Sequence, residues 1–243
     1  MPDPEVHLFK SQRTYFIFCS FAYLGNRRYC QTTMTSKASN PTTPSPDDEN
    51  SFRAQILDAA RDQVRRHGEA KTNVVDVARA MGTSHTTIYR HFRSKADLFD
   101  ALVIEAMRDE QEMATRFAEA EGPFAERIEG MVLALHARKR ERFVADPEVY
   151  GLYRRIVEER PEIIAAYSRA MTSLIARILA DAKRRGEIKV DDIDAAAGVV
   201  RDAVTVFVHP AHVAAAAAAN LPSERMARNV VRTLCAGFRA GLD

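Results

Sequence analysis

The sequence contains no tryptophan and only three cysteines in 243 residues. The cysteines form no CxxC pair, so their spacing excludes a zinc knuckle and a disulfide framework and favours a reducing, cytoplasmic setting. Strand signals are also missing, because apolar residues do not alternate with polar ones and no Asn-Gly or Asp-Gly turn occurs. No run reaches the roughly 18 apolar residues that a transmembrane helix needs. These absences predict an all-α protein without a membrane partner.

Catalytic motifs are absent as well. The sequence has no GxSxG, no HExxH and no glycine loop that could cradle a phosphate, and its ten glycines mostly mark helix ends. His209 and His212 have a spacing that could share a metal ion on a helix, but Pro210 disturbs that helix and no acid or cysteine lies near in sequence. We therefore predict no catalytic residue, no metal and no cofactor. An all-α enzyme and a helical protein–protein adaptor remain the alternative functions.

What the sequence does contain is a local surplus of positive charge. The whole chain has a formal net charge of +2, with 46% hydrophobic and 28% charged residues, which is ordinary for a globular protein. Residues 51–95 hold nine lysines and arginines against four acidic residues, a balance of 9 − 4 = +5. A nucleic-acid preference would therefore be confined to this segment.

The first 50 residues are expected to be a disordered or non-native extension. Residues 14–25 are apolar and follow two basic residues, as in a signal peptide, but the stretch after them is a poor cleavage site. Met34 then opens a segment rich in Ser, Thr, Pro and Asp that is typical of disorder and extends to residue 50. We interpret Met34 as the natural start.

From residue 51 onward the apolar spacing is helical almost without interruption. It predicts helices at 52–67, 74–81, 85–92 and 95–120, followed by 124–144, 147–159, 162–185, 192–219 and 223–242. Residues 51–97 are expected to form a three-helix DNA-binding domain, and residues 98–243 a larger helical domain for ligand binding and dimerisation.

The stretch "GTSHTTIYRHFRSKADLF" from Gly82 to Phe99 is a short turn and helix crowded with polar groups. A short helix, a turn containing glycine and a second short helix is the helix-turn-helix arrangement, whose second helix enters the major groove of DNA. Only Ile88 and Phe92 need to face inward, so the other positions are free to contact bases and phosphates. Ser84 is expected to cap this helix. The candidate DNA contacts on it and on the next helix are His85, Thr86, Thr87, Tyr89, Arg90, His91 and Lys95.

Two of these residues have a competing structural interpretation. Tyr89 could be a half-buried packing aromatic, and His91 could pack or cap as well as touch DNA. Lys95, in contrast, lies in the first turn of the next helix, where its charge opposes the helix dipole. That local misfit indicates a residue placed for a phosphate.

The segment "TNVVDVARAMGTSHTTIYRHFRSKADLFDAL" resembles the DNA-binding domain of the TetR/AcrR family of bacterial transcriptional regulators. The positions that match the family pattern are Thr72, Val74, Ala78, Gly82, Ser84, Thr87, Tyr89, His91, Phe92, Lys95 and Leu98. The resemblance implies a dimeric repressor that binds a palindromic operator and is released by a small molecule of unknown identity. It also implies phosphate contacts from Thr72, Ser84, Tyr89 and Lys95, and base contacts from positions 85–87 and 90.

The larger domain resembles the family only in its layout. A ligand pocket is expected among the helices of residues 100–180, where Met, aromatic and polar side chains recur at helical spacing. The predicted lining is Met131, Leu135, His136, Tyr150, Tyr153, Arg154, Tyr167 and Met171. Each could equally be core or surface.

The last two long helices carry apolar stripes that favour a four-helix interface between two subunits over an intrachain core alone. The residues predicted for this dimer interface are Val199, Val200, Phe207, Val230, Val231, Leu234 and Phe238.

Overall fold

The computed structural model describes residues 46–241, which form ten helices and no strand, so the predicted all-α class is confirmed. The first four are α1 (Pro46–His67), α2 (Val74–Ala80), α3 (His85–His91) and α4 (Lys95–Glu119). The others are α5 (Phe124–Ala145), α6 (Pro147–Glu159), α7 (Pro161–Arg184), α8 (Ile193–Val208), α9 (Pro210–Ala218) and α10 (Ser223–Ala240). The predictions made for residues 1–45, including a start at Met34, lie outside the described residues.

Helix α1 begins at Pro46, six residues before the predicted start at Phe52. Its first turn carries Asp47, Asp48 and Glu49, whose negative charges suit the positive end of the helix dipole. The expectation of disorder is therefore wrong for residues 46–50. Acidic residues after a proline are typical of a linker, but they are also favourable at the start of a helix.

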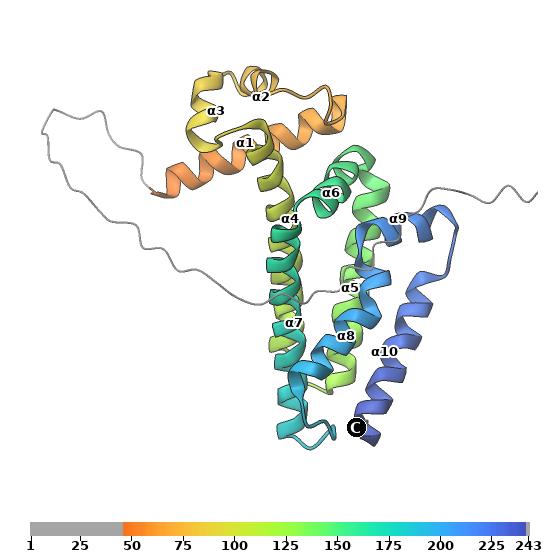
Figure 1. Cartoon of the computed structure of the whole chain (residues 1–243). Coiled ribbons are helices and arrows are strands. Elements are labelled where there is room, and N and C mark those ends of the chain that lie inside the picture. Colours follow the sequence, from red (N-terminus) through yellow and green to blue (C-terminus); the bar gives the residue numbers. More distant parts are fainter. Residues whose placement is uncertain (1–45, 242–243) are drawn as a thin grey trace, which may run out of the picture. The chain divides into compact units, whose positions relative to one another are not determined.

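Helices α1, α2 and α3 form a small unit around the beginning of α4 (Figure 1). The inward positions of α3 are Ile88 and Phe92, which are 0% and 1% exposed, as the sequence predicted. Gly82 adopts φ +65 in the turn before α3, a conformation that favours glycine. Ser84 and Ser94 both cap the helices that follow them, at α3 and α4.

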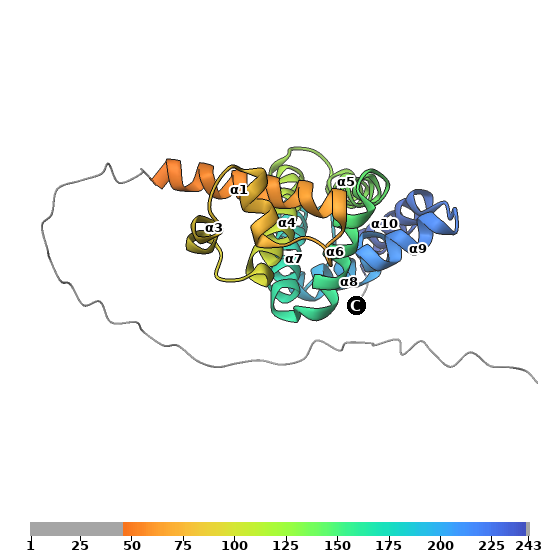
Figure 2. The same cartoon turned by 90° about the horizontal axis from the view of Figure 1, so that it is seen from above.

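Helices α5, α6 and α7 pack against the long helix α4. Helices α4 and α7 run side by side, α8 lies against α7, and α10 lies against α5 and α8 (Figure 1). Viewed from above, α9 and α10 lie on the side away from α3 (Figure 2). Among the described helices, α7 alone is long and apolar enough to cross a membrane by length and composition, and it packs here against α4, α5 and α8.

The single helix predicted over residues 192–219 is two helices in the structure, so that prediction is wrong. Helix α8 ends at Val208, His209 has the extended angles φ −80 and ψ 132, and Pro210 opens α9. The residue before a proline avoids helical angles, and proline lacks the N–H that a continuous helix requires.

Buried apolar residues form two cores, which we call the head core and the body core. The head core joins the helix-turn-helix unit to the first half of α4 and to Leu152, Tyr153 and Ile156 of α6. The body core joins the rest of α4 to α5, α7, α8 and α10. Tyr167 of α7 packs against both cores.

Candidate nucleic-acid interface and buried polar cluster

The start of α3 is fixed by two hydroxyl groups. The Ser84 hydroxyl accepts a hydrogen bond from the Thr87 amide at 3.1 Å, and the two hydroxyl oxygens lie 2.9 Å apart. This pair satisfies an amide that would otherwise lack a partner at the helix start. Ser84 is therefore a cap, whether or not it also touches a phosphate.

Four candidate residues share the exposed side of α3. His85, Thr86, Tyr89 and Arg90 are all exposed, while Ile88 between them is buried. The Tyr89 ring is 46% exposed and meets His85 edge-on, with 6.3 Å between the ring centroids. These side chains present hydroxyl, imidazole and guanidinium groups outward, the chemistry that reads base edges in a major groove.

His91 does not belong to this exposed set. It is half-buried, and its ring packs on Phe52 of α1 with 5.3 Å between centroids. Arg53, next to that phenylalanine, places its guanidinium 4.5 Å from the centroid of the Phe92 ring. His91 therefore helps to seat α3 on α1, which is the packing interpretation that the sequence left open.

The predicted phosphate contact from Thr72 is contradicted by its burial. Thr72 is 1% exposed, and its hydroxyl donates a hydrogen bond to the Gly68 carbonyl at 2.8 Å. That bond holds the loop between α1 and α2. The next residue, Asn73, is exposed at the N-cap of α2 and its side chain makes no capping hydrogen bond. Of these two neighbouring residues, only Asn73 presents a polar group outward.

Lys95 has a structural partner that the sequence did not reveal. Its ammonium donates to the Glu69 carbonyl at 3.1 Å and lies 5.3 Å from the centroid of the Phe99 ring. The side chain is half-buried and ties the α1–α2 loop to the first turn of α4. Because an ammonium has three donors, one such bond leaves capacity for a phosphate.

The same loop is also tied to α6. Arg155 forms a two-point ion pair with the Glu69 carboxylate, one bond of which is 2.9 Å long. Arg160, just after α6, pairs with Asp100 on α4. Helix α6 therefore contacts the helix-turn-helix unit with one side.

A cluster of charged and phenolic groups is buried where α4, α5, α6 and α7 meet. Glu110 and Lys139 are 0% and 1% exposed, and the Lys139 ammonium lies 2.7 Å from the Glu110 carboxylate. Tyr167 donates to the same carboxylate at 2.7 Å, and Arg142 donates to its other oxygen at 2.6 Å. Lys139 also donates to the Tyr153 hydroxyl at 2.8 Å. We refer to these five side chains as the Glu110 cluster.

Burial affects the protonation of the cluster in a consistent direction. Burial acts to lower the pKa of Lys139, but its contacts with Tyr153 and Glu110 outweigh burial and raise that pKa, so the ammonium stays charged. Burial and the nearby Glu110 charge raise the pKa of Tyr167 well above its usual value. Burial raises the pKa of Tyr153 as well, so both phenols stay neutral.

Sequence reasoning named Tyr153 and Tyr167 but missed Glu110 and Lys139. A usable signal existed, because Glu110 lies between the buried Met107 and Ala114 on the apolar stripe of α4. Lys139 likewise follows the buried Leu135 by four residues on α5. A charged residue on an apolar stripe indicates a buried ion pair.

The other predicted pocket residues do not take part in the hydrogen bonds of the cluster, although the Tyr150 ring lies 6.2 Å from that of Tyr153. Met131, Leu135 and Met171 belong to the body core, and Arg154 is exposed. His136 is within hydrogen-bonding distance of the Phe207 carbonyl at 2.8 Å and of the Ser223 hydroxyl at 3.1 Å. Tyr150 donates to the Pro210 carbonyl at 2.8 Å.

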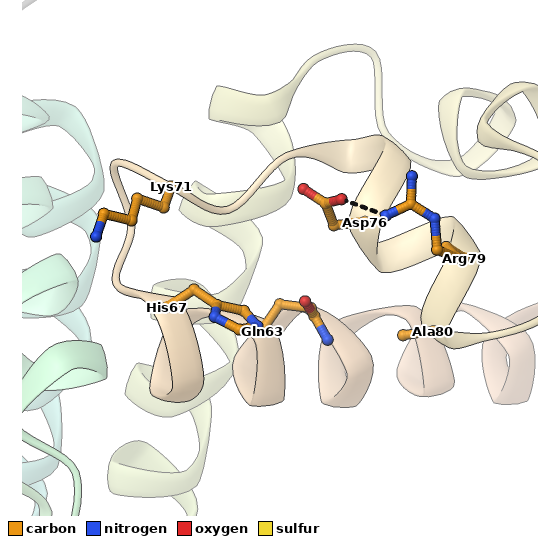
Figure 3. Close-up of a pocket in the computed structure, with 6 residues that line it drawn as sticks. All are labelled: Gln63, His67, Lys71, Asp76, Arg79 and Ala80. Atoms are coloured by element: carbon orange, nitrogen blue, oxygen red, sulfur yellow. Dashed lines mark hydrogen bonds and ion pairs between the residues drawn. The ribbon is translucent and has the colours of Figure 1, made fainter.

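Two hollows on the described surface lie elsewhere. One of about 430 Å³ is bounded by α1 and α2, where Asp76 pairs with Arg79 while Lys71 lies apart from that pair (Figure 3). The other, of about 640 Å³, lies between α4 and α5 over Met113, Ala134 and Ala137. Both are open to solvent, and neither is lined by the predicted pocket residues.

The two histidines considered for a metal lie close together in the structure. The rings of His209 and His212 have centroids 5.2 Å apart. Burial, His212 and the Lys139 charge lower the pKa of His209 to about 4, so its ring is neutral at pH 7. Within residues 46–241, no group of three histidine, cysteine or acidic side chains could hold a metal ion.

The predicted dimer interface divides into two sets. Val200, Phe207, Val231 and Phe238 are buried in the body core of one chain, so the assignment of these four to the dimer interface is wrong. The apolar stripe on each of α8 and α10 is wider than a single packing contact requires, and the centre of the stripe faces the core of its own chain. Val199 is 50% exposed, and Val230 and Leu234 are half-buried. Two further exposed apolar residues, Val206 at 49% and Met226 at 45%, lie on the same two helices.

Comparisons with known proteins place both halves of the chain in one group. The profile of "Bacterial regulatory proteins, tetR family" matches residues 56–102, and that of "Tetracyclin repressor-like, C-terminal domain" matches residues 125–231. The transcriptional regulator TtgR of Pseudomonas putida is 35% identical over 69 residues, which are 28% of this chain and 32% of TtgR. The match to this curated relative thus spans about a third of its length.

Solved structures share the fold at low sequence identity. SmeT of Stenotrophomonas maltophilia, the repressor of a multidrug efflux pump, is 19% identical with a TM-score of 0.59, over 76% of this chain and 89% of SmeT. A TetR/AcrR family regulator from Thermobifida fusca is 21% identical with a TM-score of 0.56, over 78% and 100%. FadR of Bacillus subtilis, solved with stearoyl-CoA, is 18% identical with a TM-score of 0.53, over 76% and 98%.

Proposed function

Because the chain belongs to the tetR family of bacterial regulatory proteins, we propose that it is a transcriptional regulator that binds operator DNA through α3 and is released by a small molecule. The observation that carries the proposal is the exposed side of α3, where four polar side chains share one face while Ile88 is buried. The relatives SmeT and TtgR, named as a repressor and a transcriptional regulator, support repression as its action. It acts by binding, without a catalytic step or cofactor, in the cytoplasm.

A gel shift with the DNA upstream of the protein's own gene tests this function. A regulator gives a shift that depends on sequence and weakens with salt, because released counterions drive phosphate binding. A helical adaptor or an all-α enzyme, the two alternatives, gives no sequence-dependent shift. A genomic selection for bound fragments extends the test to other operators.

The regulator is proposed to work as a homodimer formed by α8 and α10. Val199 and Val206 lie seven residues apart on one side of α8, and Met226 begins a row on α10 that continues through Val230 and Leu234. The two helices pack against each other, so their outward apolar residues lie on neighbouring elements. A two-fold axis would pair this surface with itself.

We expect Val199→Thr to raise the dissociation constant of the dimer about tenfold, because the isosteric hydroxyl is buried twice at a symmetric interface. Analytical ultracentrifugation over a range of protein concentrations measures it. Val144→Thr is the matched control, since Val144 is 70% exposed near the end of α5 and belongs to neither α8 nor α10. Equal dimer dissociation constants for the two variants would show that Val199 of α8 is not part of the interface.

Lys95→Ala is expected to weaken binding to operator and to non-specific DNA alike, because a phosphate contact carries no sequence information. The slope of the logarithm of affinity against the logarithm of salt concentration should flatten by about one unit for each subunit. Fluorescence anisotropy over a salt series measures both. An unchanged slope with weaker binding would assign Lys95 wholly to its bond with the Glu69 carbonyl.

Release is proposed to involve α4. This helix begins at Lys95 beside the reading helix and carries Glu110 in the buried cluster. Two reading helices must lie about 34–36 Å apart to enter successive major grooves. A ligand that binds one arrangement of α4 better than the other lowers operator affinity by that difference.

A further inference from the structure

The Glu110 cluster has one positive charge more than its own carboxylate can balance. Lys139 and Arg142 contribute two positive charges and Glu110 one negative charge, so the count is 2 − 1 = +1. Asp109 also pairs with Arg142 at 3.3 Å, but its side chain is 52% exposed and screened by water. The phenols of Tyr153 and Tyr167 are neutral and donate or accept hydrogen bonds.

Apart from the exposed Asp109, the groups that surround the cluster on α6 and near α9 add no further negative charge. On α6, the ionisable neighbours of Tyr150 are Tyr153, Glu110 and the cation Arg154. On the α9 side, His209 is neutral and near enough to Lys139 to feel its charge. A second anion in this region would therefore be attracted by two fixed cations and repelled by Glu110 and, more weakly, by the exposed Asp109.

Stability does not account for such a cluster. A buried ion pair is often no more stabilising than apolar side chains of the same volume, because desolvation offsets the attraction of the charges. The cluster lies between the head core and the body core, with Tyr167 packed against both. Four helices meet there, among them α4 and α6, which both reach the helix-turn-helix unit.

An apolar stripe leads from the cluster into the body core. On α5, Lys139 is preceded at four-residue steps by Leu135 and Met131, and on α7 Tyr167 is followed at the same step by Met171. Residues at this spacing lie on one face of a helix. Methionine side chains are flexible and re-pack around inserted groups, so this stripe can accept an apolar chain or ring.

We propose that the effector of this regulator is an apolar monoanion, a carboxylate or equivalent oxyanion, whose charged group binds Lys139 and Arg142 while its body enters between α5 and α7. The role of this anion as an effector rests on the proposed function. The existence of the anion-binding site does not. Tyr153 donates a further hydrogen bond to the bound anion when the Lys139 ammonium turns to it. Glu110 is then a built-in competitor for the same two cations.

The experiment compares probes that share a body and differ in charge. Octanoate, octylammonium and 1-octanol form one series, and the 2-naphthyl carboxylate, amine and alcohol form another. Binding to the full chain without DNA is measured by titration calorimetry. The carboxylate of at least one series should bind at least tenfold more tightly than its amine and alcohol, because only it gains charge-assisted hydrogen bonds.

Two variants should change carboxylate affinity in opposite directions. Glu110→Gln removes the competing charge and keeps an acceptor oxygen for Lys139, so carboxylate binding should tighten about tenfold. Lys139→Met should weaken it by at least the same factor. The control Lys71→Met makes the same change at an exposed loop lysine and should have no effect. Unfolding of a variant could only weaken binding, so it cannot produce tighter binding by one variant and weaker binding by the other.

Several results would overturn the proposal. These are equal or tighter binding of the amine or the alcohol in both series, no binding of any probe, or weaker carboxylate binding by Glu110→Gln. Operator binding without probe is measured separately. If the protein binds carboxylates but shifts no DNA, the anion site is supported and the proposed function as a regulator is contradicted. If the protein shifts DNA but does not prefer the carboxylate probes, the proposed function is supported and the anion site is contradicted.

Discussion

Glu110→Leu is expected to lower the free energy of unfolding by about 3–5 kcal/mol, because it leaves a buried ammonium without its carboxylate. Lys139 is 1% exposed and would keep only the Tyr153 hydroxyl as a hydrogen-bond acceptor. Urea unfolding followed by circular dichroism measures the loss by linear extrapolation. Because a dimer gains stability with concentration, the variants are compared at one protein concentration.

The double variant Glu110→Leu, Lys139→Met should recover most of that loss, since two apolar side chains can replace a buried ion pair at little cost. Arg142 remains 21% exposed and can still pair with Asp109. Glu112→Leu is the surface control on the same helix, and it should change stability by less than about 0.5 kcal/mol. A double variant as unstable as the single one would show that the cost lies in the shape of the site and not in the unpaired charge.

Arg90→Ala is expected to cost about 2–6 kcal/mol of operator binding by the proposed dimer, because each subunit would lose a proposed base contact of about 1–3 kcal/mol. Arg90 is exposed on α3 and forms no ion pair with any residue in the described range 46–241, so its removal leaves no partner unsatisfied. Specific binding should fall much more than non-specific binding. Anisotropy titrations with operator and with scrambled DNA measure the ratio.

Arg108→Ala is the matched control for that experiment. Arg108 is exposed on α4, outside the helix-turn-helix unit, and its removal changes the net charge equally. An equal loss in both variants would mean that Arg90 contributes only long-range attraction. A loss shared between operator and scrambled DNA would assign Arg90 to the phosphates.

The parts of the fold that the sequence could predict are those governed by neighbouring residues. Ser94 caps α4 by accepting from the Asp97 amide at 3.0 Å, and Asp97 in turn accepts from the Arg93 amide at 2.8 Å. Such reciprocal bonds depend on a spacing of three or four residues and can be read from the chain. The inward positions Ile88 and Phe92 follow from helical periodicity in the same way.

What the sequence could not supply depends on contacts between distant segments. Glu110 and Lys139 are 29 positions apart, and each taken alone has the composition of a surface residue. Thr72 was assigned a phosphate because its neighbours matched a pattern, yet its hydroxyl is satisfied within its own loop. Which part of an apolar stripe faces the chain's own core, as with Val200 against Val199, is likewise a tertiary property.

The head core has a consequence for protein engineering. The boundary expected from the sequence, between residues 97 and 98, passes through this core, because Leu152, Tyr153 and Ile156 of α6 pack with residues of α1 to α4. In a chimaera that joins another DNA-binding head at residue 98, α6 would pack against a foreign surface. Arg155 would also lose its ion-pair partner Glu69. To transplant operator specificity while keeping a cooperative fold, the exchange should be limited to the outward positions of α3, whose exposed side chains take no part in the head core.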